Sequence, residues 1–267
     1  MSFWAETFTF NGTSCQNYDL MLYDIGGDDS NDPEFASVVT VTDEWVGSRW
    51  RPYFYGSKFQ NKLTFDLVFG VNECRIDQGE YLTRSEIDAI ATWLTGHDEY
   101  HWLTIDQEDL EGIRYRCMVT GLKTVSYGRI PWALQATVTC DGPFAYRTPT
   151  SVTYNSTGSR QIQFENKSSL NGYYYPVIRF DRRSGTSFSI ENVTDGGRTF
   201  TMSNIPTSIT TIQVDNDSCV ITDDQDINLY GNCNYNWLRL KKGMNTLNLT
   251  GNGVFTFECE FPVNTGG

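Results

Sequence analysis

Polar and apolar residues alternate in short runs along the chain, which is the pattern of β-strands with one buried face. The first run, Thr7-Phe8-Thr9-Phe10, ends in the turn pair Asn11-Gly12, so it predicts a strand followed by a tight turn. Similar runs predict further strands in the first half at residues 18–23, 38–41, 63–69, 101–105, 113–125 and 132–140.

The second half of the chain shows no helical periodicity. Clusters of Asn, Gly and Asp separate its apolar runs, and regular short strands of this kind are typical of an antiparallel sandwich. The runs that predict these strands cover residues 161–165, 173–180, 188–191, 199–202, 211–214, 219–222, 237–241, 246–249 and 254–261.

One segment carries the signals of a helix instead. Thr83-Arg84-Ser85-Glu86 is a capping box, in which each of the two outer side chains accepts a hydrogen bond from the other residue's backbone N–H. The next apolar residues recur at helical spacing, and Gly96 supplies a stop. The sequence therefore predicts a helix over residues 83–95 that packs one face on a sheet, formed by Ile87, Ile90, Ala91 and Leu94.

The composition changes near Arg147-Thr148-Pro149-Thr150. Six of the seven tryptophans precede this point, whereas 14 of the 19 asparagines follow it. A compositional break that coincides with a proline indicates a domain boundary. We therefore expect a mainly β chain of two domains. Residues 1–147 would form a β-sandwich or barrel-like domain with one α-helix, and residues 148–267 an antiparallel β-sandwich.

Acidic residues are concentrated in the first half. Residues 1–150 hold 22 Asp and Glu against 11 Lys and Arg, whereas residues 151–267 hold 11 against 9. Such a surface repels phosphate, so specific binding of nucleic acid is not expected. We also expect no membrane insertion, because no run approaches the ~20 apolar residues that cross a bilayer. The N-terminus lacks a signal-peptide pattern, which indicates a protein kept in the cytosol unless something else exports it.

Metal and redox sites are poorly indicated. The seven cysteines form no CxxC pair, so we expect free thiols in a reducing compartment. His97 and His101 are four residues apart, which is ~13 Å in an extended chain and too far to share one ion. Asp224, Asp226 and Asn228 open like a calcium loop, but the later ligand positions do not fit, so a polar turn is expected.

Enzymatic motifs are also missing from the sequence. It contains no G-x-S-x-G, no phosphate-binding loop and no dinucleotide fingerprint after a strand. A pair of glycosidase carboxylates cannot be placed from sequence alone. Only two histidines are present, although histidine is the commonest acid–base residue in catalysis. We expect no enzyme, no catalytic residues, no metal and no cofactor.

A basic and aromatic segment interrupts the acidic half. It contains residue types that dominate protein interfaces, but these types also fill cores, so both partner contact and internal packing remain open. The residues concerned are Trp45, Arg49, Trp50, Arg51, Tyr53, Phe54 and Tyr55.

The order of these features resembles the distal tail proteins (Dit) of long-tailed phages over nearly the whole chain. The first half matches in the early Phe8-Thr9-Phe10-Asn11-Gly12, the segment Arg51-Pro52-Tyr53-Phe54-Tyr55-Gly56, the capped helix ending in Trp93-Leu94, and the closing run Thr139-Cys140-Asp141-Gly142-Pro143-Phe144. The second half matches in Tyr175-Pro176-Val177-Ile178, Gln213-Val214-Asp215 and Leu240-Lys241-Lys242-Gly243.

This resemblance implies a structural hub in the virion tail tip or baseplate, assembled in the host cytoplasm. Six copies would form a ring that joins the tail tube protein to tail-tip, receptor-binding or baseplate proteins and lets DNA pass. The second domain would resemble galectins and carbohydrate-binding modules in fold. If the acidic half lines the channel, the candidate acids are those in turns: Asp28, Asp29, Asp32, Glu34, Glu108, Asp109 and Glu111.

Two other functions remain open from the sequence. One is a carbohydrate-binding module for adhesion to a cell wall, with Tyr230, Tyr235 and Trp237 stacking on sugars. The other is a cell-wall hydrolase, which turnover of peptidoglycan by the purified protein would establish.

Overall fold

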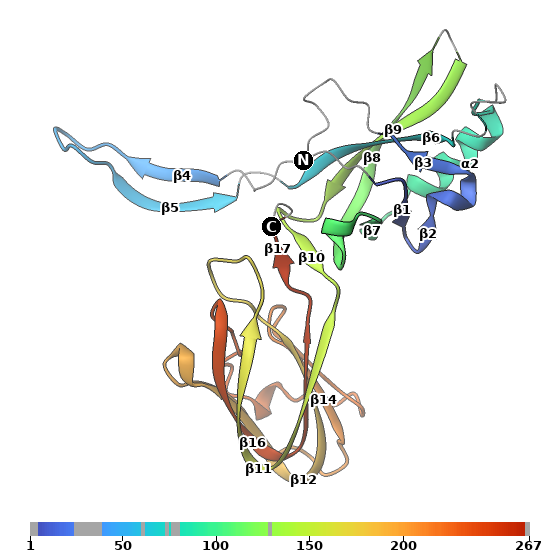
Figure 1. Cartoon of the computed structure of the whole chain (residues 1–267). Coiled ribbons are helices and arrows are strands. Elements are labelled where there is room, and N and C mark those ends of the chain that lie inside the picture. The colour runs from blue at the N-terminus through green and yellow to red at the C-terminus, as the bar shows by residue number, and fades with distance from the viewer. Residues whose placement is uncertain are drawn as a thin grey trace. The chain divides into compact units, whose positions relative to one another are not determined.

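The computed structural model describes residues 5–23, 39–59, 62–72, 75, 81–127 and 130–264. It is mainly β and divides into two compact units, the first from the N-terminal part of the chain up to Tyr146 and the second over Arg147–Val263 (Figure 1). In the described ranges, no helix is long and apolar enough to cross a membrane.

The N-terminal unit is built on an antiparallel sheet with strand order β2-β1-β7-β8-β9-β6-β3. Its outer strands are short, whereas its centre is formed by a long hairpin of β8 and β9. The strand bounds are Phe8–Phe10 for β1, Thr13–Ser14 for β2, Leu20–Leu22 for β3, Thr64–Val71 for β6, His101–Ile105 for β7, Ile113–Tyr127 for β8, Ile130–Cys140 for β9 and Ala145–Arg147 for β10.

Helix α2 (Arg84–Leu94) confirms the predicted helix and its capping box. The Thr83 side chain accepts from the Glu86 N–H, and the Glu86 carboxylate accepts from the Thr83 N–H at 2.7 Å. Ile90 and Leu94 are buried, while Ile87 and Ala91 are half-buried. Trp93 adds a second anchor, because its ring stacks between those of Phe8 and Tyr18 at centroid distances of 5.7 and 4.8 Å.

Strands β4 (Val39–Glu44) and β5 (Tyr53–Phe59) form a separate two-stranded sheet (Figure 1). Thr42 pairs with Gly56 and Asp43 with Phe54, so Tyr55 is an extra residue in β5 and creates a β-bulge. Gly56 has φ +128, a conformation that favours glycine, and this explains why the bulge lies there. We call β4, β5 and the connecting residues 45–52 the arm hairpin.

The C-terminal unit is an antiparallel sheet of order β11-β16-β12-β14-β15, with β13 paired to β12. Alternate residues of its strands are buried, and Phe180, Phe188 and Phe255 pack their rings together at its centre. The bounds are Thr150–Asn166 for β11, Val177–Asn192 for β12, Arg198–Met202 for β13, Thr211–Asp215 for β14, Val220–Asp223 for β15, Gly243–Cys259 for β16 and Pro262–Val263 for β17.

Three sequence expectations about strands are wrong. The predicted strands at 188–191, 246–249 and 254–261 do lie in strands, but they are not separate ones: the first is the end of β12, and the other two belong to β16. β16 continues through Gly251, which pairs with Gly158 in an unbroken ladder with β11. Residues 237–241 form no strand and contribute only an isolated bridge from Leu240 to Tyr174. Tyr18 ends a 3-10 turn, and Asp19 at φ +54 separates it from β3.

Candidate interaction surface

The arm hairpin exposes the aromatic residues that the sequence singled out. Trp50 is 77% exposed and Phe54 is 67% exposed, and Trp45, Tyr53 and Tyr55 are exposed as well. Successive strand residues point to opposite faces, so the consecutive residues 53–55 place aromatic rings on both faces of the ribbon. Neither face is buried within the described part of the chain.

The two arginines of the hairpin cover neighbouring rings. The Arg49 guanidinium lies 3.9 Å from the Tyr53 ring centroid, and that of Arg51 lies 3.8 Å from the Trp50 centroid. Such cation–π pairs hold the long side chains in place on a surface that the described part of the chain does not cover. The arm hairpin therefore presents flat aromatic rings and cationic groups together.

A solitary two-stranded hairpin is marginally stable in water unless it packs on something else. Large exposed apolar patches on soluble proteins mark interaction sites. Val41 and Val46 extend the patch and are also exposed, but the sequence analysis missed them. Val41 lies in β4 and Val46 in the connecting segment, and these positions assign both to the exposed surface of the arm hairpin.

Three of the seven predicted channel acids lie in the part of the chain that the structure describes. Glu108 and Asp109 lie in a 3-10 turn between β7 and β8, and Glu111 follows directly, all three with exposed side chains. Gln107 donates a hydrogen bond to Asp109 at 2.6 Å and stiffens this turn. The other four candidates, Asp28, Asp29, Asp32 and Glu34, lie outside the described residues.

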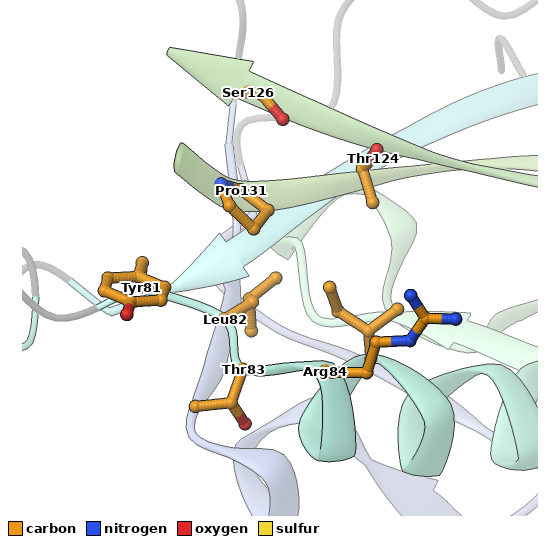
Figure 2. A pocket seen from close by; sticks show the side chains of 8 residues that line it. Tyr81, Leu82, Thr83, Arg84, Thr124, Ser126 and Pro131 are labelled. Atoms are coloured by element: carbon orange, nitrogen blue, oxygen red, sulfur yellow. The ribbon is translucent and has the colours of Figure 1, made fainter. Parts of the chain in front are cut away.

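An open groove of about 490 Å³ lies between the start of α2 and the β8–β9 hairpin (Figure 2). Arg84 is the only charged residue among the described side chains that line it, so the groove offers no acid–base pair and no activated nucleophile. The lining residues are Tyr81, Leu82, Thr83, Arg84, Ile87, Thr124, Ser126 and Pro131.

The two histidines lie close together, contrary to the separation expected for an extended chain. The rings of His97 and His101 lie 4.4 Å apart between centroids, because the chain bends at residues 98 and 99, between the two histidines. Both rings contact the edge or face of Phe10, and His97 Nε2 is 2.8 Å from the Trp93 carbonyl. Across the described ranges, His, Cys, Asp and Glu do not gather in threes that could hold a metal ion.

The calcium-like sequence lies in a polar turn, as expected. β15 ends at Asp223, whose carboxylate accepts hydrogen bonds from the N–H groups of Gln225 and Ile227. The Asp224 carboxylate accepts from the backbone N–H of Thr210 at 3.1 Å. These carboxylates therefore cap the local backbone.

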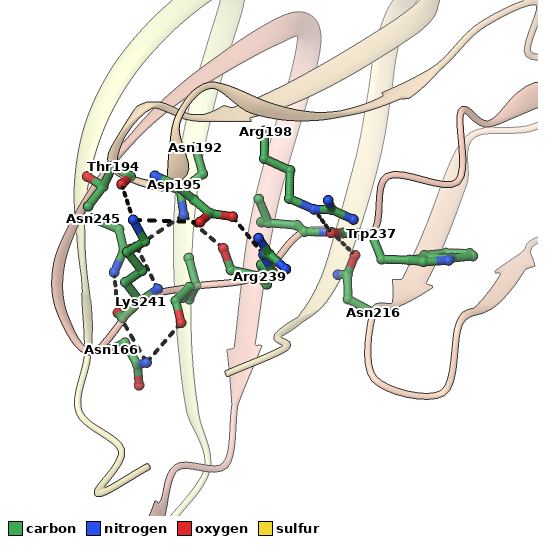
Figure 3. A network of polar contacts seen from close by, with 12 residues as sticks. Asn166, Asn192, Thr194, Asp195, Arg198, Asn216, Trp237, Arg239, Lys241 and Asn245 are labelled. Atoms are coloured by element: carbon green, nitrogen blue, oxygen red, sulfur yellow. Dashed lines mark hydrogen bonds and ion pairs between the residues drawn. The ribbon is translucent and has the colours of Figure 1, made fainter. Parts of the chain in front are cut away.

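Buried asparagines hold the irregular segment that follows this turn (Figure 3). Asn192 donates to the Arg239 carbonyl at 2.8 Å, and Asn216 accepts from the Leu238 N–H at 2.7 Å. Asn166 and Asn245 both donate to the Lys241 carbonyl, at 3.2 and 2.8 Å. Side-chain amides thus replace the missing strand ladder over residues 238–241. We call the four asparagines, Asn166, Asn192, Asn216 and Asn245, the asparagine clamp.

One carboxylate beside the clamp is strongly engaged. Asp195 accepts from Arg239 Nε at 2.7 Å, and Lys241 Nζ lies 3.7 Å away. Burial alone would raise the pKa of Asp195, but the hydrogen bonds and positive charges of these partners outweigh it and hold the pKa below its usual range. The group is an anchor for the segment and stays charged at neutral pH.

The three aromatic residues considered for sugar stacking differ in availability. Tyr230 donates its hydroxyl to the Cys219 carbonyl, and Trp237 stacks on Phe200 at a centroid distance of 5.8 Å. Tyr235 is exposed and has φ +58, an uncommon conformation for a bulky residue. Among the described residues, the rings of these three side chains make no contact with one another, so they do not form one stacking platform.

Comparison with known proteins gives matches in both units. Residues 3–142 match the sequence family described as the phage tail protein N-terminal domain, and residues 144–259 match the phage tail C-terminal domain. No curated protein sequence matches this chain.

A solved structure shows the same fold. The crystal structure of the SPP1 Dit protein (gp 19.1), described as a paradigm of the hub adsorption apparatus in phages infecting Gram-positive bacteria, is similar over 96% of this chain and 98% of that chain, with a TM-score of 0.68 and 14% identity. Two structures of the activated phage P2 baseplate, with Ca and with Sr, cover 95% and 96% of this chain and 97% of theirs, with TM-scores of 0.45 and 0.44 and identities of 11% and 13%.

Proposed function

Because this chain belongs to the phage tail protein family and contains both the N-terminal and the C-terminal domain of that family, we propose that it is a structural hub subunit of a tail tip, without catalytic activity. The observation that carries the proposal is the fold shared over nearly the full length with a hub protein of the adsorption apparatus. The groove beside α2, which holds no acid–base pair among its described lining, is consistent with a structural role.

The hub assembles as a ring of identical subunits, six by the resemblance to distal tail proteins. The arm hairpin supplies a contact between subunits or with a neighbouring tail protein. This assignment is supported by the exposure of Trp50 and Phe54, by the marginal stability of a lone hairpin, and by the aromatic and arginine content typical of interface hot spots. The remaining partners are the tail tube protein, tail-tip proteins and receptor-binding or baseplate proteins.

DNA passes through the ring without being bound. The turn at Glu108–Glu111 presents exposed acids from a half of the chain with twice as many acidic as basic residues. If this turn faces the bore, like charges keep DNA from adhering, with a screening length of about 10 Å at 0.1 M salt. If it faces outward, the acids only maintain solubility, and a map of the ring distinguishes the two arrangements.

Assembly of the full chain tests the hub proposal. Size-exclusion chromatography with light scattering, followed by negative-stain images, should give a ring for the natural chain. The double variant Trp50→Ser/Phe54→Ser should elute as a monomer with an unchanged circular-dichroism spectrum. Tyr235→Ser is the matched control, because it removes an exposed aromatic ring from the other unit and should keep the ring.

Two results would count against this proposal. A natural chain that stays monomeric at every concentration contradicts the ring. A ring that persists in the hairpin double variant contradicts a contact between subunits through the arm hairpin, while leaving the hub assignment intact.

Carbohydrate binding is a second candidate, favoured by one polar row on the C-terminal sheet. Gln161, Asn248 and Glu191 are in register across β11, β16 and β12, joined by hydrogen bonds of 3.0 and 2.8 Å. Planar amide and carboxylate groups held in this way can bond the hydroxyls of a sugar. A cell-wall pull-down with the full chain should lose binding in Asn248→Ala, and equal retention of both proteins would reject this candidate.

A further inference from the structure

Two cysteines face each other in the N-terminal sheet. Cys117 lies in β8 and Cys140 in β9, and the antiparallel register pairs them directly. Both side chains are fully buried, and both thiols are free. Residues directly opposite each other in an antiparallel pair place their side chains on the same face of the sheet. The two sulfur atoms are therefore neighbours in the interior of this unit.

The hydrogen bonds around the pair define its geometry. The Cys140 N–H donates away from β8, to the Leu63 carbonyl at 2.8 Å. The next residue, Asp141, donates its N–H back to β8, to the Arg116 carbonyl at 2.8 Å. Since ladder bonds alternate along an antiparallel pair, Cys117 and Cys140 occupy a non-hydrogen-bonded position. At such positions the Cα atoms approach to about 4.5 Å, closer than at the hydrogen-bonded ones.

This spacing is compatible with a covalent bond. Disulfides require Cα atoms about 4.4–6.8 Å apart and Cβ atoms about 3.5–4.5 Å apart. No other two of the cysteines that the structure describes are partners in a strand register; Cys259, for example, faces Thr150. From this placement we propose that Cys117 and Cys140 are a latent cross-strand disulfide that joins β8 to β9 when the chain folds under oxidising conditions.

The oxidant in this reaction is a small-molecule disulfide such as oxidised glutathione. One cysteine thiolate attacks it, forms a mixed disulfide and releases one reduced glutathione. The second cysteine then attacks the protein sulfur of the mixed disulfide, closes the Cys117–Cys140 bond and releases the second glutathione. Two protein thiols are oxidised, one glutathione disulfide is reduced to two thiols, and both protons end on glutathione.

Burial determines when the bond can form. Desolvation, together with the negative charge of Asp141, raises the pKa of Cys140 to about 12, and burial raises the pKa of Cys117 further. The thiolate is the reactive species, so the folded and reduced sheet resists oxidation. The bond therefore forms during folding or when β8 and β9 separate, and a chain folded in a reducing cytosol keeps both thiols.

Oxidative refolding of the full chain tests this proposal. The denatured protein is refolded in a mixture of oxidised and reduced glutathione, its thiols are alkylated, and its peptides are mapped by mass spectrometry. We expect one dominant cross-linked peptide pair containing Cys117 and Cys140, lighter than the two free peptides by two hydrogen atoms. Cys15, also buried but without a facing cysteine, should be recovered alkylated.

Three further measurements complete the test. The folded, reduced protein in the same buffer should keep Cys117 and Cys140 reduced, and the oxidised form should melt at a higher temperature. Cys15→Ser should retain the cross-link, whereas Cys117→Ser should lose it. Full alkylation of both cysteines after oxidative refolding, or disulfides spread evenly over all cysteines, would overturn the proposal. Because mapping of the natural chain decides this, the result does not depend on a variant that folds.

Discussion

The arm hairpin and the strand pair β12–β16 are both antiparallel and rich in aromatic residues, but only the second has a core behind it. Phe180, Phe188 and Phe255 are at most 2% exposed and pack ring against ring, whereas Trp50 and Phe54 are mostly exposed. The same class of residue thus stabilises the fold in one region and is left uncovered in the other. Aromatic content indicates that apolar surface will be buried, but only the three-dimensional structure indicates whether the chain itself buries it.

The largest effect should follow from removing a ring at the centre of the C-terminal core. Phe255→Ala leaves a cavity between Phe180 and Phe188, and such changes cost about 3–5 kcal/mol. Urea unfolding monitored by fluorescence should show this loss. Val152→Ala, an exposed change in β11 of the same sheet, is the control and should be nearly neutral. A near-neutral Phe255→Ala would remove the contrast between core and hairpin.

A somewhat smaller loss is expected on the helix of the N-terminal unit. Ile90 is a buried residue of α2, so Ile90→Ala should lower the free energy of unfolding by about 2–5 kcal/mol. Ile87→Ala, at a half-buried position of the same face, should cost less. Urea denaturation of both variants provides the comparison, and equal losses would show that the two positions are buried to the same degree.

The cap of α2 should contribute less and depend on pH. Burial alone would raise the pKa of Glu86, but its hydrogen bonds with Thr83 and its contact with Arg75 at 2.9 Å hold the pKa below the usual range. A lowered pKa means that this stabilisation is present above the ordinary carboxyl pKa and is lost as the pH falls. Thr83→Ala should cost about 0.5–2 kcal/mol at neutral pH.

Acid titration measures the pH dependence of the cap. The difference in urea midpoint between the natural chain and Glu86→Gln should be largest near neutrality and should shrink as acidification protonates the carboxylate. Asp88→Asn, an exposed change on the same helix, serves as the control. A difference that grows on acidification would contradict the assigned direction of the pKa shift.

The smallest effect on stability is expected in the arm hairpin. Trp50→Ala should change the free energy of unfolding of the monomeric chain by no more than about 0.5 kcal/mol, because the ring covers no core. Urea unfolding at low protein concentration separates this change in the free energy of unfolding from any effect of assembly. A loss as large as that of Phe255→Ala would mean that the ring is buried within the chain and would abolish the comparison.

Much of the fold could be predicted from the sequence because local signals agreed with the tertiary structure. Residues 101–105 alternate and pair as β7, and the capping box begins α2 where predicted. The long strands were divided because Gly158 and Gly251 lie within the ladder, where glycine usually indicates a turn. Strand β5 was missed because Tyr53, Phe54 and Tyr55 are consecutive aromatics. Alternation requires one buried face, and the described residues bury neither face of the arm hairpin.

The candidate site was found as a group of residues, but its exposure was not predictable. Aromatic and arginine side chains fill cores and interfaces alike, so the sequence left both open. The histidine pair shows a related limit, since the bend at residues 98 and 99 brings together rings that an extended chain would separate. Reasoning from spacing alone fails wherever the chain reverses.

The asparagine clamp has a consequence for how this protein can vary. Its amides bond backbone atoms of residues 238–241 and not their side chains, so the path of the segment does not depend on the residues at positions 239 and 241. Substitutions there lose side-chain contacts alone: those of Arg239 with Asp195 and the Tyr173 ring, and those of Lys241 with Asp195 and the Thr194 carbonyl. We expect related chains to keep the four asparagines while the residues they hold diverge, which makes this segment a natural place for one lineage to acquire a new surface without rebuilding its sheet.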